Sequence, residues 1–196
     1  MIYNIFGVQI HSIDIKSFDK VENELIQYCY QEKKKDPVGV QLSNKGGWQS
    51  KSHGFRESFL FSLLQKSVFD YFEENKIFRD GVGIQMTNMW ININGKGSYN
   101  MMHDHPQSDL AVIWYITDNM PGKLIFKDPH SFARSRLYNK INQSIPMKEN
   151  INQQYAPVCN AGDILIFPAD LLHGVTPSYK KELRISVSFN LLLKPY

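Results

Sequence analysis

The amino-acid sequence predicts an α+β fold that is mainly β. Apolar residues recur at helical intervals in the first part of the chain, and from residue 82 onward they alternate with polar residues at the period of a strand. Helices followed by many short strands are typical of a domain whose second part is a sheet sandwich or a barrel. A chain of 196 residues can bury one sizeable core, so we expect a single domain over residues 1–196.

Two stretches have the spacing of amphipathic helices. In residues 17–34, Leu25 and Cys29 stand about one helical turn apart, and residues 55–75 repeat this apolar interval several times. We therefore expect helical support for the fold over about residues 15–76.

The later stretches have the alternation and the β-branched and aromatic content of strands. They are residues 82–94, 108–117, 122–128, 162–169 and 182–193. Turn-forming pairs, among them Asn94-Gly95 and Ala161-Gly162, separate them.

Residues 130–157 show neither the helical nor the strand pattern, because they are polar and only weakly periodic. Long irregular segments in compact domains are usually lids, binding loops or disordered stretches, and we expect a lid or substrate loop here, with plain disorder as a nearly equal alternative. The glycine-containing stretch at residues 43–50 is a second candidate for a loop that faces substrate.

Composition excludes several function classes. A formal net charge of +3 is too small to indicate a nucleic-acid partner. Cys29 and Cys159 lie far apart without a C-x-x-C pattern, which fits a reducing compartment rather than a disulfide framework. The first residues do not form a signal peptide, and no stretch is long enough to span a membrane. We expect a cytoplasmic protein without a membrane partner; the sequence does not indicate its oligomeric state.

Residues 100–109, NMMHDHPQSD, concentrate side chains that bind metals. In a strand, His103 and His105 would project from one face and Asp104 from the other, so that both imidazoles could reach one cation. Such a pair also arises by chance, and the stretch could equally be a polar turn.

A third histidine and an arginine lie near the end of the chain. His173 stands between apolar neighbours, where a buried histidine without a ligand role is common. The strand that follows is apolar on one face and carries Arg184, Ser186, Ser188 and Asn190 on the other. This polar face is either solvent-exposed surface or the wall of a pocket, where an arginine could bind a carboxylate through two hydrogen bonds.

The order of these residues resembles that of the Fe(II)/2-oxoglutarate-dependent oxygenase superfamily, in its prolyl-hydroxylase-like branch. More closely, the chain resembles oxygenases of marine bacteria and their phages. The resemblance covers nearly the whole chain, through residues 43–50, 89–106, 122–129, 161–177 and 184–190.

The resemblance implies a double-stranded β-helix, or jelly roll, over about residues 82–193. It implies that His103 and His173 bind Fe(II) and that Arg184, with Ser186 beside it, binds the far carboxylate of 2-oxoglutarate. Tyr115 falls where this branch often has a hydroxyl that bonds the same carboxylate, although a strand tyrosine packed in the core is an equal alternative.

The chain departs from the superfamily at the third ligand, because the usual motif is H-x-D and His105 occupies the carboxylate position. Strand alternation favours His105 as the ligand, which would give a site of three histidines. Asp104 could bind instead if a bulge rotated the strand. Asp109 is a third option.

The resemblance implies a dioxygenase, most simply a hydroxylase, that uses Fe(II), 2-oxoglutarate and dioxygen on a protein, peptide or small-molecule substrate. We expect iron affinity to fall below roughly pH 6, where histidines gain protons. Alternation allows Asn92 to reach the pocket, whereas Trp90 is expected in the core and Asn94 in a turn. Two alternatives are a cupin-like three-histidine metalloenzyme that does not use 2-oxoglutarate and a non-catalytic jelly-roll binding module.

Overall fold

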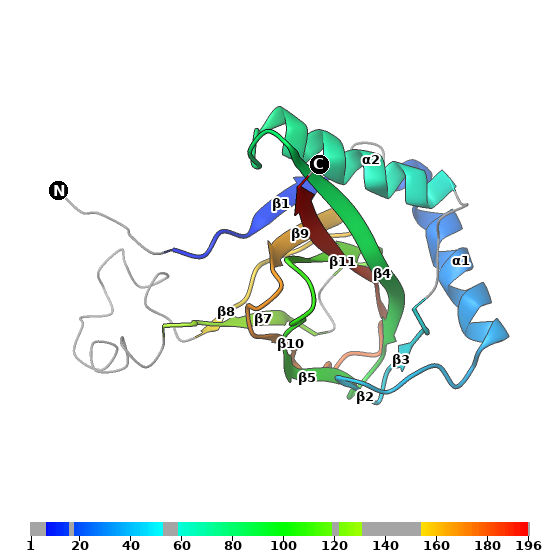
Figure 1. Ribbon diagram of the computed structural model, residues 1–196. Coiled ribbons are helices and arrows are strands. Elements are labelled where there is room, and N and C mark those ends of the chain that lie inside the picture. Colours follow the sequence, from blue (N-terminus) through cyan, green and yellow to red (C-terminus); the bar gives the residue numbers. More distant parts are fainter. Residues whose placement is uncertain (1–6, 16–17, 53–58, 119–121, 131–153, 196) are drawn as a thin grey trace.

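The computed structural model describes residues 7–15, 18–52, 59–118, 122–130 and 154–195. Two sheets face each other, and helices cover the outer face of the larger one (Figure 1). None of the helices within these ranges is long and apolar enough to cross a membrane.

The helices form where the sequence predicts them. A short 3-10 helix, η1 (Phe18–Lys20), leads into α1 (Glu22–Lys35), and α2 spans Phe59–Glu74. Leu25 and Cys29 are fully buried one turn apart on α1, which fixes the face that this helix turns toward the sheet.

The larger sheet has the strand order β1-β9-β6-β11-β4-β3. Its strands are β1 (His11–Asp14), β3 (Trp48–Gln49), β4 (Val82–Asn94), β6 (Leu110–Tyr115), β9 (Asp163–Pro168) and β11 (Arg184–Pro195). The smaller sheet has the order β2-β5-β10-β7-β8, and its strands are β2 (Asn44–Lys45), β5 (Tyr99–His103), β7 (Leu124–Lys127), β8 (Gln154–Tyr155) and β10 (His173–Val175).

The chain crosses repeatedly between the two sheets from β4 to β11, and the paired strands are antiparallel. This is the topology of a double-stranded β-helix, so the predicted jelly roll with N-terminal helices is confirmed. The long predicted strands are all present, and β4 has the predicted bounds. The short strands β2, β3, β8 and β10 were not predicted, because two or three residues carry no readable alternation.

The helices decide which face of β11 looks inward. Its apolar residues Ile185, Val187 and Phe189 pack in one cluster with residues of α1 and α2, such as Leu25 and Val68. Its polar residues therefore face the space between the sheets, where Arg184, Ser186, Ser188 and Asn190 line a cavity. The structure thus resolves the choice that the sequence left open in favour of a pocket wall.

A second apolar cluster fills the other part of the space between the sheets. It contains Ala111, Tyr115, Leu124, Phe126, Cys159, Leu165, Phe167, Leu171 and Val175. The cavity therefore lies between this cluster and the polar faces of β4 and β11. Most of the predicted lid at 130–157 lies outside the described residues.

Candidate metal and cosubstrate site

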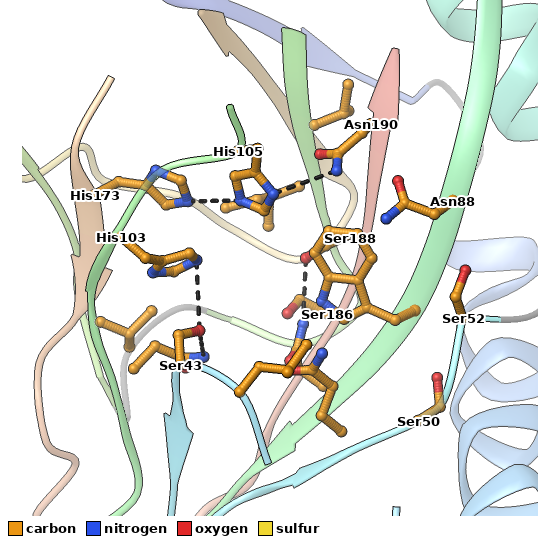
Figure 2. Close-up of a pocket in the computed structure, with 18 of the residues that line it drawn as sticks. Ser43, Ser50, Ser52, Asn88, His103, His105, His173, Ser186, Ser188 and Asn190 are labelled. Carbon is orange, nitrogen blue, oxygen red and sulfur yellow. Dashed lines mark hydrogen bonds between the residues drawn. The ribbon is translucent and has the colours of Figure 1, made fainter. Parts of the chain in front are cut away.

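Three histidines converge at one end of the cavity. His103 ends β5, His173 begins β10, and the two are directly paired across these strands. Together with His105 they form a group in which one ligand nitrogen of each lies within 4.8 Å of the others. Figure 2 shows the three rings turned toward one another.

The structural reason for the position of His105 differs from the one that the sequence suggested. Strand β5 ends at His103, so His105 lies in the turn that follows it, and the argument from strand alternation was wrong. The backbone N–H of His105 donates to the carbonyl of Ala169 (2.8 Å), and its own carbonyl accepts from the N–H of Ser108 (3.1 Å). The first bond ties the turn to the loop before β10, and the second closes the turn itself.

Backbone carbonyls orient two of the three rings. Nδ1 of His103 lies 2.7 Å from the carbonyl of Met101, and Nδ1 of His173 lies 2.8 Å from that of Leu171. A carbonyl only accepts, so each Nδ1 carries the proton and each Nε2 keeps its lone pair. Such outer hydrogen bonds are what metal-binding histidines usually have.

Burial keeps these imidazoles neutral. It lowers the pKa of His103, and it lowers the pKa of His105 to about 4 and that of His173 to about 3. The neighbouring His103 lowers the pKa of His105 and His173 further. Metal ions bind the neutral imidazole, so all three rings have the right charge at neutral pH.

The nearby carboxylates do not join this group. Asp104 is exposed at the rim of the cavity. Asp109 is also exposed, and its Oδ2 accepts a hydrogen bond from the backbone N–H of Leu193 at 2.7 Å. Within the described part of the chain, the converging ligand set consists of imidazoles alone.

The cavity itself has a volume of about 480 Å³. Trp90, which the sequence placed in the core, lines this cavity and stacks on His105 with ring centres 5.7 Å apart and planes at 23°. Asn92 also lines it, and the amide of Asn92 donates to the hydroxyl of Ser188 at 3.2 Å. Asn94, expected in a turn, is instead buried at the end of β4 and bonds Asn100.

Arg184 is the buried cation of the cavity. Only 3% of its surface is exposed, and burial lowers its pKa from the usual range. No ion pair among the described residues includes it, and its Nε has no hydrogen-bond partner within them. A buried guanidinium without a counter-charge is costly, so this position fits an anionic ligand. The buried Ser186 lines the cavity beside it.

Tyr115 combines a packed ring with a buried hydroxyl. The ring packs in the second apolar cluster, and the residue is fully buried. Its buried hydroxyl makes no hydrogen bond of good geometry among the described residues, and the Cys159 thiol is its one side-chain contact there. Burial raises the pKa of this hydroxyl, whereas the Arg184 guanidinium acts in the opposite direction. The hydroxyl therefore stays protonated near Arg184 and remains able to donate to a ligand.

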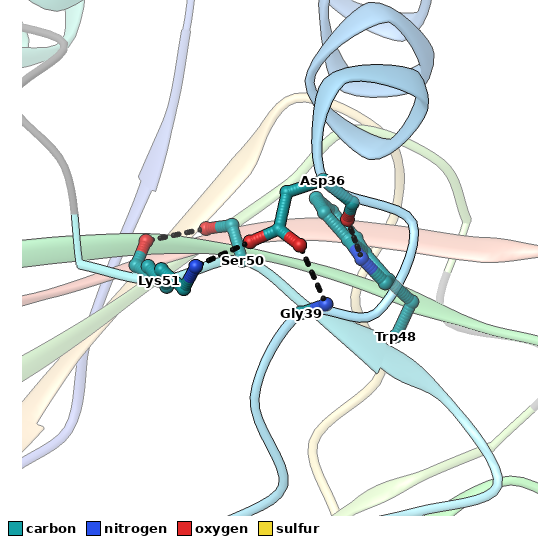
Figure 3. A network of polar contacts seen from close by, with 5 residues as sticks. All are labelled: Asp36, Gly39, Trp48, Ser50 and Lys51. Carbon is teal, nitrogen blue, oxygen red and sulfur yellow. Dashed lines mark hydrogen bonds and ion pairs between the residues drawn. The ribbon is translucent and has the colours of Figure 1, made fainter.

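The segment from Asp36 to Ser52 forms the outer wall, and a polar network fixes it (Figure 3). The two carboxylate oxygens of Asp36 contact the backbone N–H of Gly39 (3.2 Å) and Nζ of Lys51 (3.1 Å). The carbonyl of Asp36 accepts from Nε1 of Trp48 at 2.8 Å. Residues 43–50, expected to face substrate, contribute Ser43, Gln49 and Ser50 to the cavity wall.

The other two histidines of the described residues lie away from this group. Nδ1 of His11 lies 3.0 Å from the hydroxyl of Tyr71, and His130 belongs to a turn after β7. His53 lies outside the described residues. The sequence places Asn190 on the polar face of β11 without indicating a role, and its side chain lies 3.3 Å from Nδ1 of His105.

Comparison with known proteins agrees with this geometry. The model of the family described as "Putative 2OG-Fe(II) oxygenase" matches residues 88–190, a range that includes the three histidines, Tyr115 and Arg184. No curated protein matches the chain.

Several solved structures share the fold. The viral collagen prolyl hydroxylase of Paramecium Bursaria Chlorella virus-1, solved with 2-oxoglutarate, has a TM-score of 0.59 at 13% identity, over 94% of this chain and 96% of that one. A prolyl hydroxylase from Trichoplax adhaerens, in complex with a hypoxia-inducible-factor peptide, has a TM-score of 0.65 at 14% identity, over 93% and 83%. HygX from Streptomyces hygroscopicus, with nickel, 2-oxoglutarate and hygromycin B bound, has a TM-score of 0.59 at 10% identity, over 94% and 82%.

Proposed function

Since the chain belongs to the 2OG-Fe(II) oxygenase family, we propose that His103, His105 and His173 hold its iron and that Arg184 anchors its 2-oxoglutarate. The protein is a 2-oxoglutarate-dependent oxygenase with Fe(II) and 2-oxoglutarate as cofactors. The observation that carries the proposal is the presence, in one cavity, of three converging neutral imidazoles and a buried guanidinium that has no counter-charge among the described residues.

The ligand set fits iron because three ligands on one side leave coordination positions open on the other. When bound, the iron supplies the oxidative chemistry that couples decarboxylation of 2-oxoglutarate to oxidation of a substrate C–H bond. The role of this chain is to hold the ligands at a fixed geometry in a partly dry cavity. The backbone bonds of His103 and His173 serve that role.

Arg184 binds the carboxylate of 2-oxoglutarate that lies farthest from the metal. A guanidinium donates two parallel hydrogen bonds to a carboxylate and stays charged when buried. Ser186 and Tyr115 stand directly opposite each other on β11 and β6, so both hydroxyls can donate to the same anion. This arrangement favours a dicarboxylate cosubstrate over the cupin-like alternative, in which Arg184 would lack a counter-ion within the described part of the chain.

The absence of a carboxylate among the proposed ligands has an electrostatic consequence. Three neutral imidazoles leave the ion with its full formal charge of 2+, whereas an aspartate would cancel part of it. We therefore expect this site to attract the 2-oxoglutarate dianion more strongly than a site with an aspartate ligand.

The outer part of the cavity favours a hydrogen-bonding substrate without negative charge for hydroxylation, since the Asp104 carboxylate lies at its rim. Its wall carries amide and hydroxyl side chains, namely those of Ser43, Gln49, Ser50, Ser52, Asn88 and Asn100, together with the Trp90 ring. Lys51 also lines the wall, but Asp36 neutralises it. A peptide segment and a small polar molecule both meet this description.

The test is turnover of 2-oxoglutarate to succinate in the presence of Fe(II) and dioxygen without added substrate. We expect slow, iron-dependent succinate formation by the native protein and loss of it in Arg184→Ala and His173→Ala. Arg79→Ala, which changes an exposed arginine outside the cavity, is the control and should behave as the native protein. Native turnover by Arg184→Ala would contradict the proposed anchor.

A further inference from the structure

His105 is held differently from the other two histidines. A backbone carbonyl fixes Nδ1 of His103 and of His173, and a backbone carbonyl can only accept a hydrogen bond. Nδ1 of His105 instead faces the side-chain amide of Asn190, with Nδ2 of Asn190 at 3.3 Å (Figure 2). An amide offers both a donor and an acceptor, so it imposes no single protonation pattern on the ring.

The hydrogen bonds of the structure define one pattern of protons. Nε2 of His105 lies 3.3 Å from Nε2 of His173, so one of these nitrogens carries the shared proton. His173 uses its only proton to bond the carbonyl of Leu171, which makes its Nε2 the acceptor. His105 therefore has its proton on Nε2, and its Nδ1 accepts from the Asn190 amide N–H.

A metal ion requires the opposite pattern, because it binds the lone pair of Nε2. The proton of the His105 ring must then sit on Nδ1, which becomes a donor and needs an acceptor. We propose that Asn190 is the positioning residue that supplies this acceptor: its amide rotates by half a turn and presents Oδ1 to Nδ1–H of His105 when the metal binds. This inference rests on the proposed role of His105 as the third ligand.

The surroundings of Asn190 suit such a rotation. The residue is 4% exposed, and its Oδ1 has no hydrogen-bond partner among the described residues. Its backbone is fixed in β11, where it pairs with Ala111 and its carbonyl accepts from the hydroxyl of Thr87. An oxygen and an NH2 group are nearly the same size, so the half-turn needs no extra space and breaks only the bond to His105.

The plane of the His105 ring stays fixed while the amide turns. The Trp90 ring stacks on the His105 ring with an angle of 23° between their planes. The His173 ring also stacks on His105, with an angle of 11° and ring centres 5.1 Å apart. Stacking restricts the tilt of the ring but does not select which nitrogen carries the proton. That selection is left to Asn190, and it would be lost if an apolar side chain replaced the amide.

Spectroscopy of the unmodified protein tests the proton positions directly. Nitrogen-15 NMR of the histidine rings should show His105 with its proton on Nε2 in the metal-free protein and on Nδ1 after addition of Zn(II), a diamagnetic probe. A His105 ring with its proton on Nδ1 in both samples would overturn the inference. This measurement needs no variant and does not depend on enzyme activity.

Variants test the energetic consequence through Zn(II) affinity in competition titrations. Asn190→Leu, similar in shape but without hydrogen bonds, should bind Zn(II) about 10–100-fold more weakly than the native protein. Asn190→Asp, which accepts the Nδ1–H bond, should bind at least as tightly as the native protein. Asn94→Leu removes an equally buried asparagine of the neighbouring strand that does not line the cavity, and should leave the affinity unchanged.

The results separate this inference from the proposed function. If His105→Ala binds Zn(II) as tightly as the native protein, His105 is not a ligand and the proposed ligand set fails. If His105→Ala loses affinity while Asn190→Leu keeps it, the ligand set stands and only the role of Asn190 is wrong.

Discussion

His103 and His173 are paired directly across β5 and β10, with ring centres 4.4 Å apart. Two of the proposed iron ligands are therefore cross-strand neighbours whose separation is set by the sheet itself. His105 joins them from a turn, where Asn190, Trp90 and the bond to Ala169 fix it. The sheet holds two ligands rigidly, and the third depends on side chains.

The first prediction concerns the identity of the third ligand. His105→Ala should reduce Fe(II) affinity at least 10-fold because it removes one of three metal bonds. Asp104→Ala should leave the affinity unchanged, since Asp104 is exposed outside the converging group. Anaerobic Fe(II) titration measures both, and loss of binding in Asp104→Ala alone would reverse the assignment.

Asp109 has a structural role that can be separated from metal binding. Its carboxylate caps the backbone N–H of Leu193 at 2.7 Å. Asp109→Ala should lower the free energy of unfolding by about 1–2 kcal/mol through loss of this charged hydrogen bond, with native iron affinity. Urea denaturation beside the iron titration provides the comparison, and weakened iron binding would show that the carboxylate takes part in the site.

Arg184 should lower the stability of the ligand-free protein and strengthen the binding of 2-oxoglutarate. Arg184→Met removes a buried cation that lacks a counter-charge among the described residues, so the free energy of unfolding without ligands should rise by about 1–4 kcal/mol. The same change should weaken 2-oxoglutarate binding roughly 100-fold or more, the effect of losing a buried charge pair. Calorimetric titration and urea denaturation test the two halves, and a less stable variant would mean that Arg184 has an internal partner.

Tyr115 offers a test of its hydroxyl alone. Because this hydroxyl makes no hydrogen bond of good geometry among the described residues and contacts only the weakly bonding Cys159 thiol, Tyr115→Phe should hardly lower the free energy of unfolding. If the hydroxyl donates to 2-oxoglutarate, its loss should weaken cosubstrate binding by about 0.5–1.5 kcal/mol, or roughly 2- to 13-fold. Unchanged affinity would assign Tyr115 to core packing only.

The pH dependence of metal binding follows from the lowered pKa values of the histidines. Protons compete with metal only below the pKa of each ring, which is about 4 for His105, about 3 for His173 and below the usual value for His103. The sequence alone suggested a fall in affinity below roughly pH 6. The lowered pKa values move most of this fall in affinity to lower pH. Between pH 7 and pH 5 only His103 can take up a proton to a large extent, so the Zn(II) affinity should fall by no more than about tenfold per pH unit.

The same shifts determine how the stability of the metal-free protein varies with pH. Unfolded histidines take up protons near pH 6.5, whereas these buried rings resist protonation until lower pH. The unfolded state therefore binds more protons in the acidic range, and the stability present above pH 6.5 is lost as pH falls toward 4 and 3. Urea denaturation at pH 7 and pH 5 should show the decrease, and His173→Ala should make it smaller.

Gly39 allows two parts of the outer wall to approach each other closely. Its φ is +60°, and an added Cβ would lie 2.3 Å from the carbonyl oxygen of Gln49. Gly39→Ala must therefore displace the wall and should cost well over the roughly 1 kcal/mol expected for the strained backbone alone. Gly81 is the matched control, since it has a φ of +80° and open space around its Cβ position. Equal losses of stability would show that contact with Gln49 is unimportant.

The sequence predicted most of the fold because the long strands alternate clearly; residues 82–94 correspond to β4 residue for residue. It could not tell which face of β11 is internal, since that depends on where α1 and α2 dock. The helices take the face of Ile185 and Val187, which leaves Arg184 and Ser186 for the cavity.

At the site, the sequence predicted the three histidines that converge but not the reason that His105 reaches them. Periodicity cannot show that β5 ends at His103 and that a turn follows. Trp90 was expected in the core because a tryptophan in a strand usually packs there, yet it stacks on His105 inside the cavity. Asn190 could not be linked to His105, since contact across 85 residues depends on the folded topology.

The most direct test of the account is an anaerobic titration of the metal-free protein with Fe(II) and then with 2-oxoglutarate, followed by visible absorption. Chelation of 2-oxoglutarate to iron held by His103, His105 and His173 should produce a charge-transfer band, and Arg184→Ala should shift its appearance to much higher 2-oxoglutarate concentrations. Iron binding without the band would contradict the account, because the three histidines would then belong to a metal site that does not use 2-oxoglutarate.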